Sequence, residues 1–414
     1  MIHRHIRCTF LLFGILCSCS TKIESDWKGP IRNGTYPETG LQNKWAENGP
    51  ALLWRYDGLH MGHSSPAVTD DAIYVTGMPD STTGILYCLD LDGNLLWKDE
   101  YGKEYKISYT GSRSTPVVTS RELYLISGIG EVICYDLKMR EKKWTKQMVG
   151  EYSDSIPKYG HAQSALIDGN RLFCIPGGEE FNVICLHRET GELIWSSRGN
   201  GEMATYSSPI LVNHHGHEIL VAVTNESILG MDAKRGDLLW RVPFKPLFVR
   251  HVNTPIYHEG RIFMATDSYN NEGGIVAIEL NDDGSEASIL WERKDIRNLL
   301  NGFIVRENLL FTPTYRKKDW QSLDIETGET VYTWTGYVDG TITYADSLYY
   351  VLANDGKVLL CENAEGGLHT ISSFQLDISI YNPFAPLWAF PVIKNKLLYI
   401  RHKGSLFAYN ISAN

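Results

Sequence analysis

Residues 186–195 read Leu-His-Arg-Glu-Thr-Gly-Glu-Leu-Ile-Trp: the end of one strand, a Thr-Gly turn, and a second strand that carries a tryptophan. Related patterns return along most of the chain, with a tryptophan every 43 to 51 residues. These tryptophans are Trp54, Trp97, Trp144, Trp195, Trp240, Trp291 and Trp334. Self-similarity at this period is typical of repeat architectures, in which each unit packs against its neighbours.

The repeat that ends at Trp240 shows what one unit contains. The apolar runs 208–212, 218–223 and 227–232 read as three strands, and a fourth begins at Leu238 after a Gly-containing turn. Short β-rich runs separated by Gly, Asp and Asn are the signature of strands and tight turns. After the N-terminal leader no segment shows a sustained 3.6-residue apolar stripe, so we expect few helices.

The units close into a ring. Their first strands begin near Ser65, Thr115, Gln163, Ser208, Thr254, Gly302, Gly340 and Phe390, which makes eight units. The last unit has three strands and no closing tryptophan, while residues 51–55 form an unpaired strand before the first complete unit. Joining the two ends removes the exposed sheet edges that invite aggregation. The sequence therefore predicts an all-β, eight-bladed β-propeller over residues 50–414, closed by an N-terminal strand in the C-terminal blade.

The repeat resembles that of the quinoprotein-type (PQQ-like) propellers, whose blades carry variants of the pattern AxDxxTGxxxW. The resemblance spans residues 27–411 and implies that each tryptophan docks against the next blade. Within this group, the chain resembles the BamB-type outer-membrane assembly lipoproteins in its length, its eight blades and its expected lipid anchor. This resemblance implies a scaffold role. The Gly/Pro-rich segment 27–41 departs from that type.

The N-terminus has the features of an export signal. Arg4 and Arg7 precede the apolar run 9–16, which is too short to span a bilayer. The following Leu-Cys-Ser-Cys resembles a bacterial lipobox that ends at Cys19. We expect a signal peptide over 1–18, lipidation of Cys19, an approach segment over 19–49, and a periplasm-facing place on the outer membrane. A plain secreted protein is the alternative.

The other cysteines follow the repeat. Four of them occupy the same third-strand position in different blades, too far apart to bridge: Cys88, Cys134, Cys185 and Cys361. We expect these to be buried free thiols. Cys174 lies on the second strand of the blade that contains Cys185, so a disulfide between these two remains open.

Candidate functional residues gather on one face of the ring, here called the entry face. It carries the connections into the innermost strands and the loops between the second and third strands. The entry connections are long, and loops of this kind often carry function. The residues expected to line an axial pocket there are His63, Arg113, Tyr159, His161, Tyr206, Arg250, His251 and Trp388. Such a pocket suits an anion or a sugar ring; alternatively, each residue only supports a strand entry.

These features favour a non-catalytic binding scaffold, a monomer that presents the pocket to an envelope protein or a glycan. With a net charge of −10 and interspersed basic residues, the chain has no nucleic-acid footprint. The alternative is a lyase acting on uronate-containing polysaccharides. In that hypothesis His161 or Tyr206 is the base and His63 the acid partner, while Arg113 or Arg250 neutralises the carboxylate.

A PQQ-dependent dehydrogenase is the least favoured reading, and we expect no cofactor. The quinoprotein enzymes of this group carry adjacent cysteines and a Ca²⁺ site, and the sequence has no Cys-Cys dipeptide. The only dense histidine run, 214–217, lies between a first and a second strand. We expect an exposed hairpin tip there and no metal site, because no acid or cysteine stands at ligand spacing.

Overall fold

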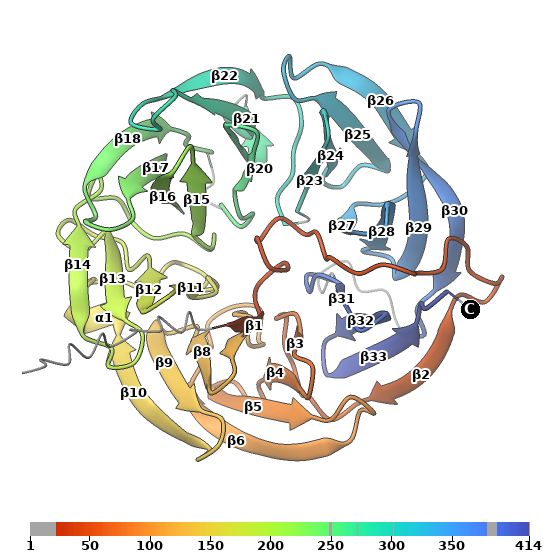
Figure 1. Cartoon of the computed structure of the whole chain (residues 1–414), viewed down its shortest axis with the longest axis horizontal. Coiled ribbons are helices and arrows are strands. Elements are labelled where there is room, and N and C mark those ends of the chain that lie inside the picture. Colours follow the sequence, from red (N-terminus) through yellow and green to blue (C-terminus); the bar gives the residue numbers. More distant parts are fainter. Residues whose placement is uncertain (1–21, 248–250, 271, 301, 379–386, 414) are drawn as a thin grey trace, which may run out of the picture.

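A computed structural model describes residues 22–247, 251–270, 272–300, 302–378 and 387–413. Its strands form eight antiparallel sheets arranged as blades around a central axis, with the first strand of each blade nearest the axis (Figure 1). The predicted eight-bladed propeller is therefore confirmed. The described part of the chain contains one short α-helix, α1 (Met148–Glu151), in line with the absence of helical periodicity in the sequence.

The blades follow one another along the chain. Blade I contains β3 (Ala67–Val68), β4 (Ile73–Gly77), β5 (Thr83–Leu89) and β6 (Leu95–Lys103), and blade II contains β7 (Val117–Thr119), β8 (Glu122–Ile126), β9 (Glu131–Asp136) and β10 (Glu141–Gln147). Blade III contains β11 (Leu166–Asp168), β12 (Arg171–Cys174), β13 (Val183–His187) and β14 (Leu193–Ser197), and blade IV contains β15 (Ile210–His214), β16 (His217–Val223), β17 (Ser227–Asp232) and β18 (Leu238–Pro243). Blade V contains β19 (Ile256–His258), β20 (Arg261–Tyr269), β21 (Glu272–Leu280) and β22 (Ala287–Arg293), and blade VI contains β23 (Ile304–Arg306), β24 (Leu309–Pro313), β25 (Asp319–Asp324) and β26 (Thr330–Thr335). Blade VII contains β27 (Gly340–Ala345), β28 (Leu348–Ala353), β29 (Lys357–Ala364) and β30 (Gly367–Gln375).

Blade VIII combines one strand from the N-terminal part of the chain with three from its C-terminal part. It contains β31 (Val392–Lys394), β32 (Leu397–His402) and β33 (Ser405–Asn410), and its outer strand is β2 (Ala51–Tyr56). The strand β2 pairs antiparallel with β33, from Ala51 opposite Asn410 to Tyr56 opposite Leu406. Residues from before blade I therefore supply the strand that the last repeat lacks.

The repeated tryptophans join neighbouring blades. In five of them the indole Nε1 donates to a backbone carbonyl of the next blade at 2.8–3.3 Å: Trp54 to Leu91, Trp144 to Arg188, Trp195 to Ala233, Trp240 to Gly284, and Trp291 to Ile325. In four of these pairs, all except that of Trp240, the indole ring also covers the turn glycine of the next blade. Gly191 has φ +72°, and a Cβ there would lie 2.7 Å from the Trp144 ring. The Thr-Gly turn and the tryptophan of the preceding blade are thus two halves of one contact.

The cysteines of the described chain are free and buried. In blade III, Cys174 lies opposite Ile184 in the strand register, and Cys185 lies opposite Phe173. Because successive strand residues point to opposite faces of a sheet, the two thiols enter different packing clusters. The disulfide that the sequence left open is therefore not formed.

The histidine run 214–217 forms the β15–β16 hairpin, and its tip is exposed as predicted, whereas the first histidine of the run is not. His214 is buried, and its ring nitrogens contact the Tyr257 hydroxyl at 2.9 Å and the Asn281 carbonyl at 2.8 Å. His215 and His217 are exposed. Among the residues that the structure describes, no group of three or more His, Cys, Asp or Glu side chains could hold a metal ion.

The described part of the expected approach segment enters the channel of the ring. The strand β1 (Ile23–Ser25) pairs with β7, placing Ile23 opposite Thr119 near the end of that innermost strand. The chain then turns back, and its returning segment bonds to the innermost strand of blade VII, where the Tyr36 amide donates to the Tyr344 carbonyl at 2.9 Å. Both segments thus lie towards the face opposite the entry face. Figure 1 shows the red trace of this part of the chain crossing the centre of the ring. We call residues 22–41 the N-terminal plug.

The tip of the N-terminal plug is fixed inside the channel. Trp27 Nε1 donates to Thr254 Oγ1 at 2.9 Å, at the start of blade V. Arg32 is buried, forms an ion pair with Asp26 at 2.6 Å, and donates to the Pro209 carbonyl at 3.2 Å. The plug therefore occupies the channel on the side opposite the entry face. No helix in the described ranges is long and apolar enough to cross a membrane.

Candidate functional site

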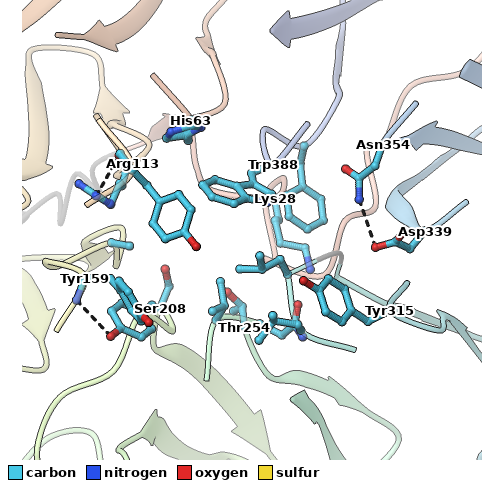
Figure 2. A pocket seen from close by; sticks show the side chains of 18 of the residues that line it. Lys28, His63, Arg113, Tyr159, Ser208, Thr254, Tyr315, Asp339, Asn354 and Trp388 are labelled. Atoms are coloured by element: carbon cyan, nitrogen blue, oxygen red, sulfur yellow. Dashed lines mark hydrogen bonds between the residues drawn. The ribbon is translucent and has the colours of Figure 1, made fainter. Parts of the chain in front are cut away.

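An axial cavity of about 750 Å³ lies between the N-terminal plug and the entry face (Figure 2). Trp27 and Lys28 of the plug form part of its lining, together with residues at the starts of innermost strands such as Ser208 and Thr254. The volume is within the range of about 300–1,000 Å³ that is usual for small-molecule sites. The closed ring thus contains a concave site that the N-terminal plug borders on one side.

One wall of the axial cavity is a continuous series of rings. His63 and Trp388 have centroids 4.6 Å apart, and Tyr109 follows at 5.3 Å from Trp388. The series goes on to Tyr159 at 5.9 Å and Tyr206 at 5.8 Å. Each residue comes from the connection into a different blade, so five blades build this wall. We call these five residues the aromatic arc; their spacings are those of favourable aromatic pairs.

The charges that line the axial cavity are mostly positive. Lys28, Arg113 and the exposed run 316–318 of the β24–β25 loop are basic. Among the described lining residues the only carboxylate is Asp339, which accepts a hydrogen bond from Asn354 Nδ2 at 3.2 Å. The whole chain has a net charge of −10, so this concentration of basic groups is local. A cleft lined by one sign of charge attracts ligands of the opposite sign.

Lys28 is the buried cation of the site. Its side chain is only 3% exposed, and Figure 2 shows it pointing into the cavity. Its Nζ lies 4.8 Å from the centroid of the Phe390 ring and 5.9 Å from that of Phe303. Burial lowers the pKa of Lys28 to about 7, because an ammonium group loses its hydration there.

Arg113 shapes the entry connection. Its guanidinium donates to the backbone carbonyls of Gly111 at 3.3 Å and Tyr109 at 3.0 Å, and also to that of Ser108. It lies 5.6 Å from the ring centroid of Tyr105. Arg113 therefore braces the loop that carries Tyr109 of the aromatic arc, and several of its N–H groups are engaged in doing so.

The structure brings together five of the eight residues that the sequence assigned to the pocket. His63, Arg113, Tyr159, Tyr206 and Trp388 all line the axial cavity. Their role in ligand binding stays a prediction.

Two of the other three lie elsewhere, and the third is not among the described residues. His161 and His251 are fully buried and do not line the axial cavity, so the structure does not place the proposed base His161 at the site. Burial lowers the pKa of each to about 4. Arg250 and the expected lipidation residue Cys19 lie outside the described residues.

Several lining residues were missed by the sequence reasoning. Trp27 and Lys28 come from the N-terminal plug, and Tyr315 with the basic run 316–318 comes from the β24–β25 loop. The basic run carried a signal, because loops between second and third strands share the entry face. The plug residues carried none, since their partners lie far away in the sequence.

Comparison with known proteins supports the fold. The sequence matches the family described as "outer membrane protein assembly factor BamB" over residues 46–175 and 154–367. No curated protein sequence matches. The crystal structure of BamB from Moraxella catarrhalis is similar, with a TM-score of 0.60 and 12% identity over 88% of this chain and 98% of that chain. A computationally designed protein, Ika8, gives a TM-score of 0.59 and 13% identity over 88% of this chain and 100% of that one.

An enzyme also shares the fold. The quinohemoprotein alcohol dehydrogenase from Comamonas testosteroni gives a TM-score of 0.64 and 9% identity, over 93% of this chain and 79% of that chain. At such identities these structures establish the fold alone.

The residues of the axial cavity do not fit a quinone cofactor with Ca²⁺. Calcium requires six to eight oxygen ligands, several of them carboxylates. The described lining offers one carboxylate, Asp339, which already accepts a hydrogen bond from Asn354. No cysteine is among the described lining residues. The donor set therefore suits an organic anion better than a metal-bound quinone.

Proposed function

The chain belongs to the family of the outer membrane protein assembly factor BamB, and on that premise we propose that it is a non-catalytic binding propeller of the bacterial cell envelope. Its entry face, with the axial cavity at the centre, receives a protein partner or a glycan. Family membership favours a protein partner, and the aromatic arc favours a sugar ring. The protein acts by binding and needs no cofactor.

The observation that carries this proposal is that the entry face combines a cavity with exposed apolar side chains. The axial cavity opens there, and large apolar side chains are exposed on the connections around it: Ile107, Tyr109, Met203 and Leu247. Exposed apolar groups beside a cavity and framed by charged residues are typical of interaction sites. At the opposite end of the channel, the N-terminal plug fills the space that a ligand would need.

Part of the acid–base set that a lyase needs lies in the axial cavity, but its two histidines are poorly suited to proton transfer. His161 lies away from the axial cavity. Burial and the nearby Arg113 charge lower the pKa of His63 to about 3, so His63 is neutral near pH 7 and unsuited to donate a proton. The Tyr206 hydroxyl accepts a hydrogen bond from the Tyr159 amide at 3.3 Å. Proton transfer requires a group in reach of the substrate with a pKa near the working pH, and binding is therefore the better-supported function.

The lipid anchor is part of the proposal. A lipidated Cys19 would precede β1 by four residues, which span about 14 Å at most. Because Ile23 pairs with Thr119 towards the opposite face, such an anchor would hold that face near the membrane and leave the entry face free. Metabolic labelling with a fatty-acid analogue tests this: the label should enter the wild-type protein and be lost in Cys19→Ser.

Site-specific photo-cross-linking in cells that naturally produce the protein tests the binding face. A photoreactive residue at Met203 on the entry face is compared with one at Val331 on β26, since these side chains are 47% and 48% exposed. We expect a discrete adduct from position 203 and none from position 331. Adducts from position 331 alone would refute the assignment of the entry face.

A further inference from the structure

Building on the proposed binding function, we propose that the inner end of the axial cavity is a carboxylate-recognition site. Lys28 of the N-terminal plug contacts the carboxylate, and the aromatic arc holds the ring-shaped body to which it is attached. The ligand class is thus a small ring compound that carries a carboxylate, such as a uronic acid or an aromatic acid.

The first argument is the isolation of the Lys28 charge. In the ranges that the structure describes, no hydrogen bond or ion pair engages its Nζ, and its near neighbours are the rings of Phe303 and Phe390. Burial of an ammonium group without a counter-ion is unfavourable, and proteins usually pair such a charge. An unpaired buried amine that points into a cavity suits an anion-binding site, because an anion beside it favours its charged form.

The second argument is that the chain holds Lys28 in place by other means. Lys28 has φ +58°, a left-handed backbone conformation that is unfavourable for this residue type. The Gly34 amide donates to its carbonyl at 2.9 Å, and the neighbouring Trp27 is tied to Thr254. The plug therefore fixes the backbone at this point and directs the Lys28 side chain into the cavity.

The third argument is that other polar groups of the inner cavity are already used within the protein. Asn253 Nδ2 donates to the Ala265 carbonyl at 2.9 Å, and Ser208 Oγ accepts from the Ser164 amide at 2.9 Å. Lys28 is thus the charged group available at the inner end. The exposed basic run 316–318 lies at the mouth, where it would attract an anion from solution.

The shape of the axial cavity indicates the rest of the ligand. The aromatic arc offers ring faces and edges along one wall, and such walls favour flat apolar surfaces. Tyr315 supplies a further ring in the lining, and Arg297 and Arg316 lie over it at 5.4 and 5.2 Å. A ring of sugar or aromatic type, with its carboxylate directed at Lys28, matches both the apolar walls and the buried charge.

Calorimetric titration of the full mature protein tests the proposal. The probes are glucuronate and benzoate, each compared with an uncharged relative, glucose and benzyl alcohol. We expect at least one carboxylate to bind at least tenfold more tightly than its uncharged relative. Binding of glucuronate alone identifies a sugar acid, and binding of benzoate alone an aromatic acid.

Lys28→Met should remove this preference by at least tenfold and leave the affinity for the uncharged ring unchanged. Lys28→Arg should retain part of the preference, and Lys318→Met, at the mouth, should retain most of it. An unchanged melting temperature or a higher one in Lys28→Met shows that the fold is intact.

Absence of binding by both carboxylates at 10 mM, or an equal loss for charged and uncharged rings in Lys28→Met, would overturn the carboxylate site. Neither result would affect the cross-links expected from position 203, so the wider binding function is tested separately.

Discussion

Replacing Arg32 with methionine is expected to release the N-terminal plug while the ring stays folded. Arg32 is 2% exposed and forms an ion pair with Asp26 at 2.6 Å. It also donates to the backbone carbonyl of Pro209 in blade IV at 3.2 Å and to that of Ala165 in blade III. The Arg32 side chain therefore links the two segments of the plug to each other and to blades III and IV.

The expected size of the effect follows from Asp26, whose buried carboxyl group loses its partner. Burial already raises the pKa of Asp26 against the opposing effect of Arg32. Removal of one partner from a buried ion pair costs about 3–5 kcal/mol, because the other charge stays buried without compensation. That cost falls mainly on docking of the plug, and every 1.4 kcal/mol is tenfold in an equilibrium constant. Opening of the plug should become more frequent by at least about 100-fold.

Hydrogen exchange measures this opening directly. The amides of Gly34 and Tyr36 are bonded to the carbonyls of Lys28 and Tyr344 at 2.9 Å in the docked plug, so their protection should fall by about two orders of magnitude. The double variant Asp26→Asn with Arg32→Met is the control, and it should recover part of the protection because no carboxylate remains unpaired. Unchanged exchange at Gly34 and Tyr36, or an equal loss throughout blades III and IV, would refute the reasoning.

Three further predictions concern the blades and the buried groups. Gly328→Ala should lower the free energy of unfolding by about 2–4 kcal/mol, because φ is +72° and the new Cβ would lie 2.6 Å from the Trp291 ring. Gly169→Ala is the control: φ is +56° and nothing lies within 4 Å of the new Cβ, so the free energy of unfolding should fall by only about 1–2 kcal/mol. Equal losses of stability in thermal melts of the two variants would contradict the tryptophan contact. Alkylation without reductant should leave the five described cysteines unmodified in the native protein and label all five after unfolding, whereas a bridged Cys174 would reduce that number to three. Burial lowers the pKa of Lys28 to about 7 from an ordinary value of 10.5, so between pH 7 and 10 the unfolded chain keeps a proton that the native protein has lost. The contribution of Lys28 to the free energy of unfolding therefore rises with pH over this range. Melting curves of Lys28→Met should lack this rise, and identical pH profiles for the variant and the wild type would contradict the prediction.

The fold could be predicted from the sequence because its determinants are local and repeated. A turn glycine such as Gly191 and the tryptophan of the preceding blade, Trp144, form a contact that recurs along the ring. Seven tryptophans at a regular spacing therefore defined the blades. The incomplete last repeat and the unpaired segment 51–55 together indicated the composition of blade VIII.

The candidate site was predictable only in part, because a repeat position does not fix the direction of a side chain. His63, His161 and His251 all precede innermost strands, yet only His63 lines the axial cavity. The backbone of the entry connections decides which of these rings faces the axis, and those connections differ in length and conformation between blades.

The N-terminal plug could not be predicted from the sequence, for a different physical reason. Trp27 bonds to Thr254, 227 residues away, and Arg32 bonds to Pro209, 177 residues away. Such contacts leave no periodic trace in the sequence. Lys28, the most isolated charge of the cavity, was missed with them.

Hydrogen exchange across the whole protein, compared between isolated envelopes and the purified chain, tests most directly whether the entry face is where this propeller binds. Added protection is expected in the entry connections that carry Tyr109 and Met203 and in the plug tip at Trp27 and Lys28. Outer strands such as β26 should exchange equally in both states. Protection confined to the outer strands, or an identical pattern in both states, would contradict the central claim.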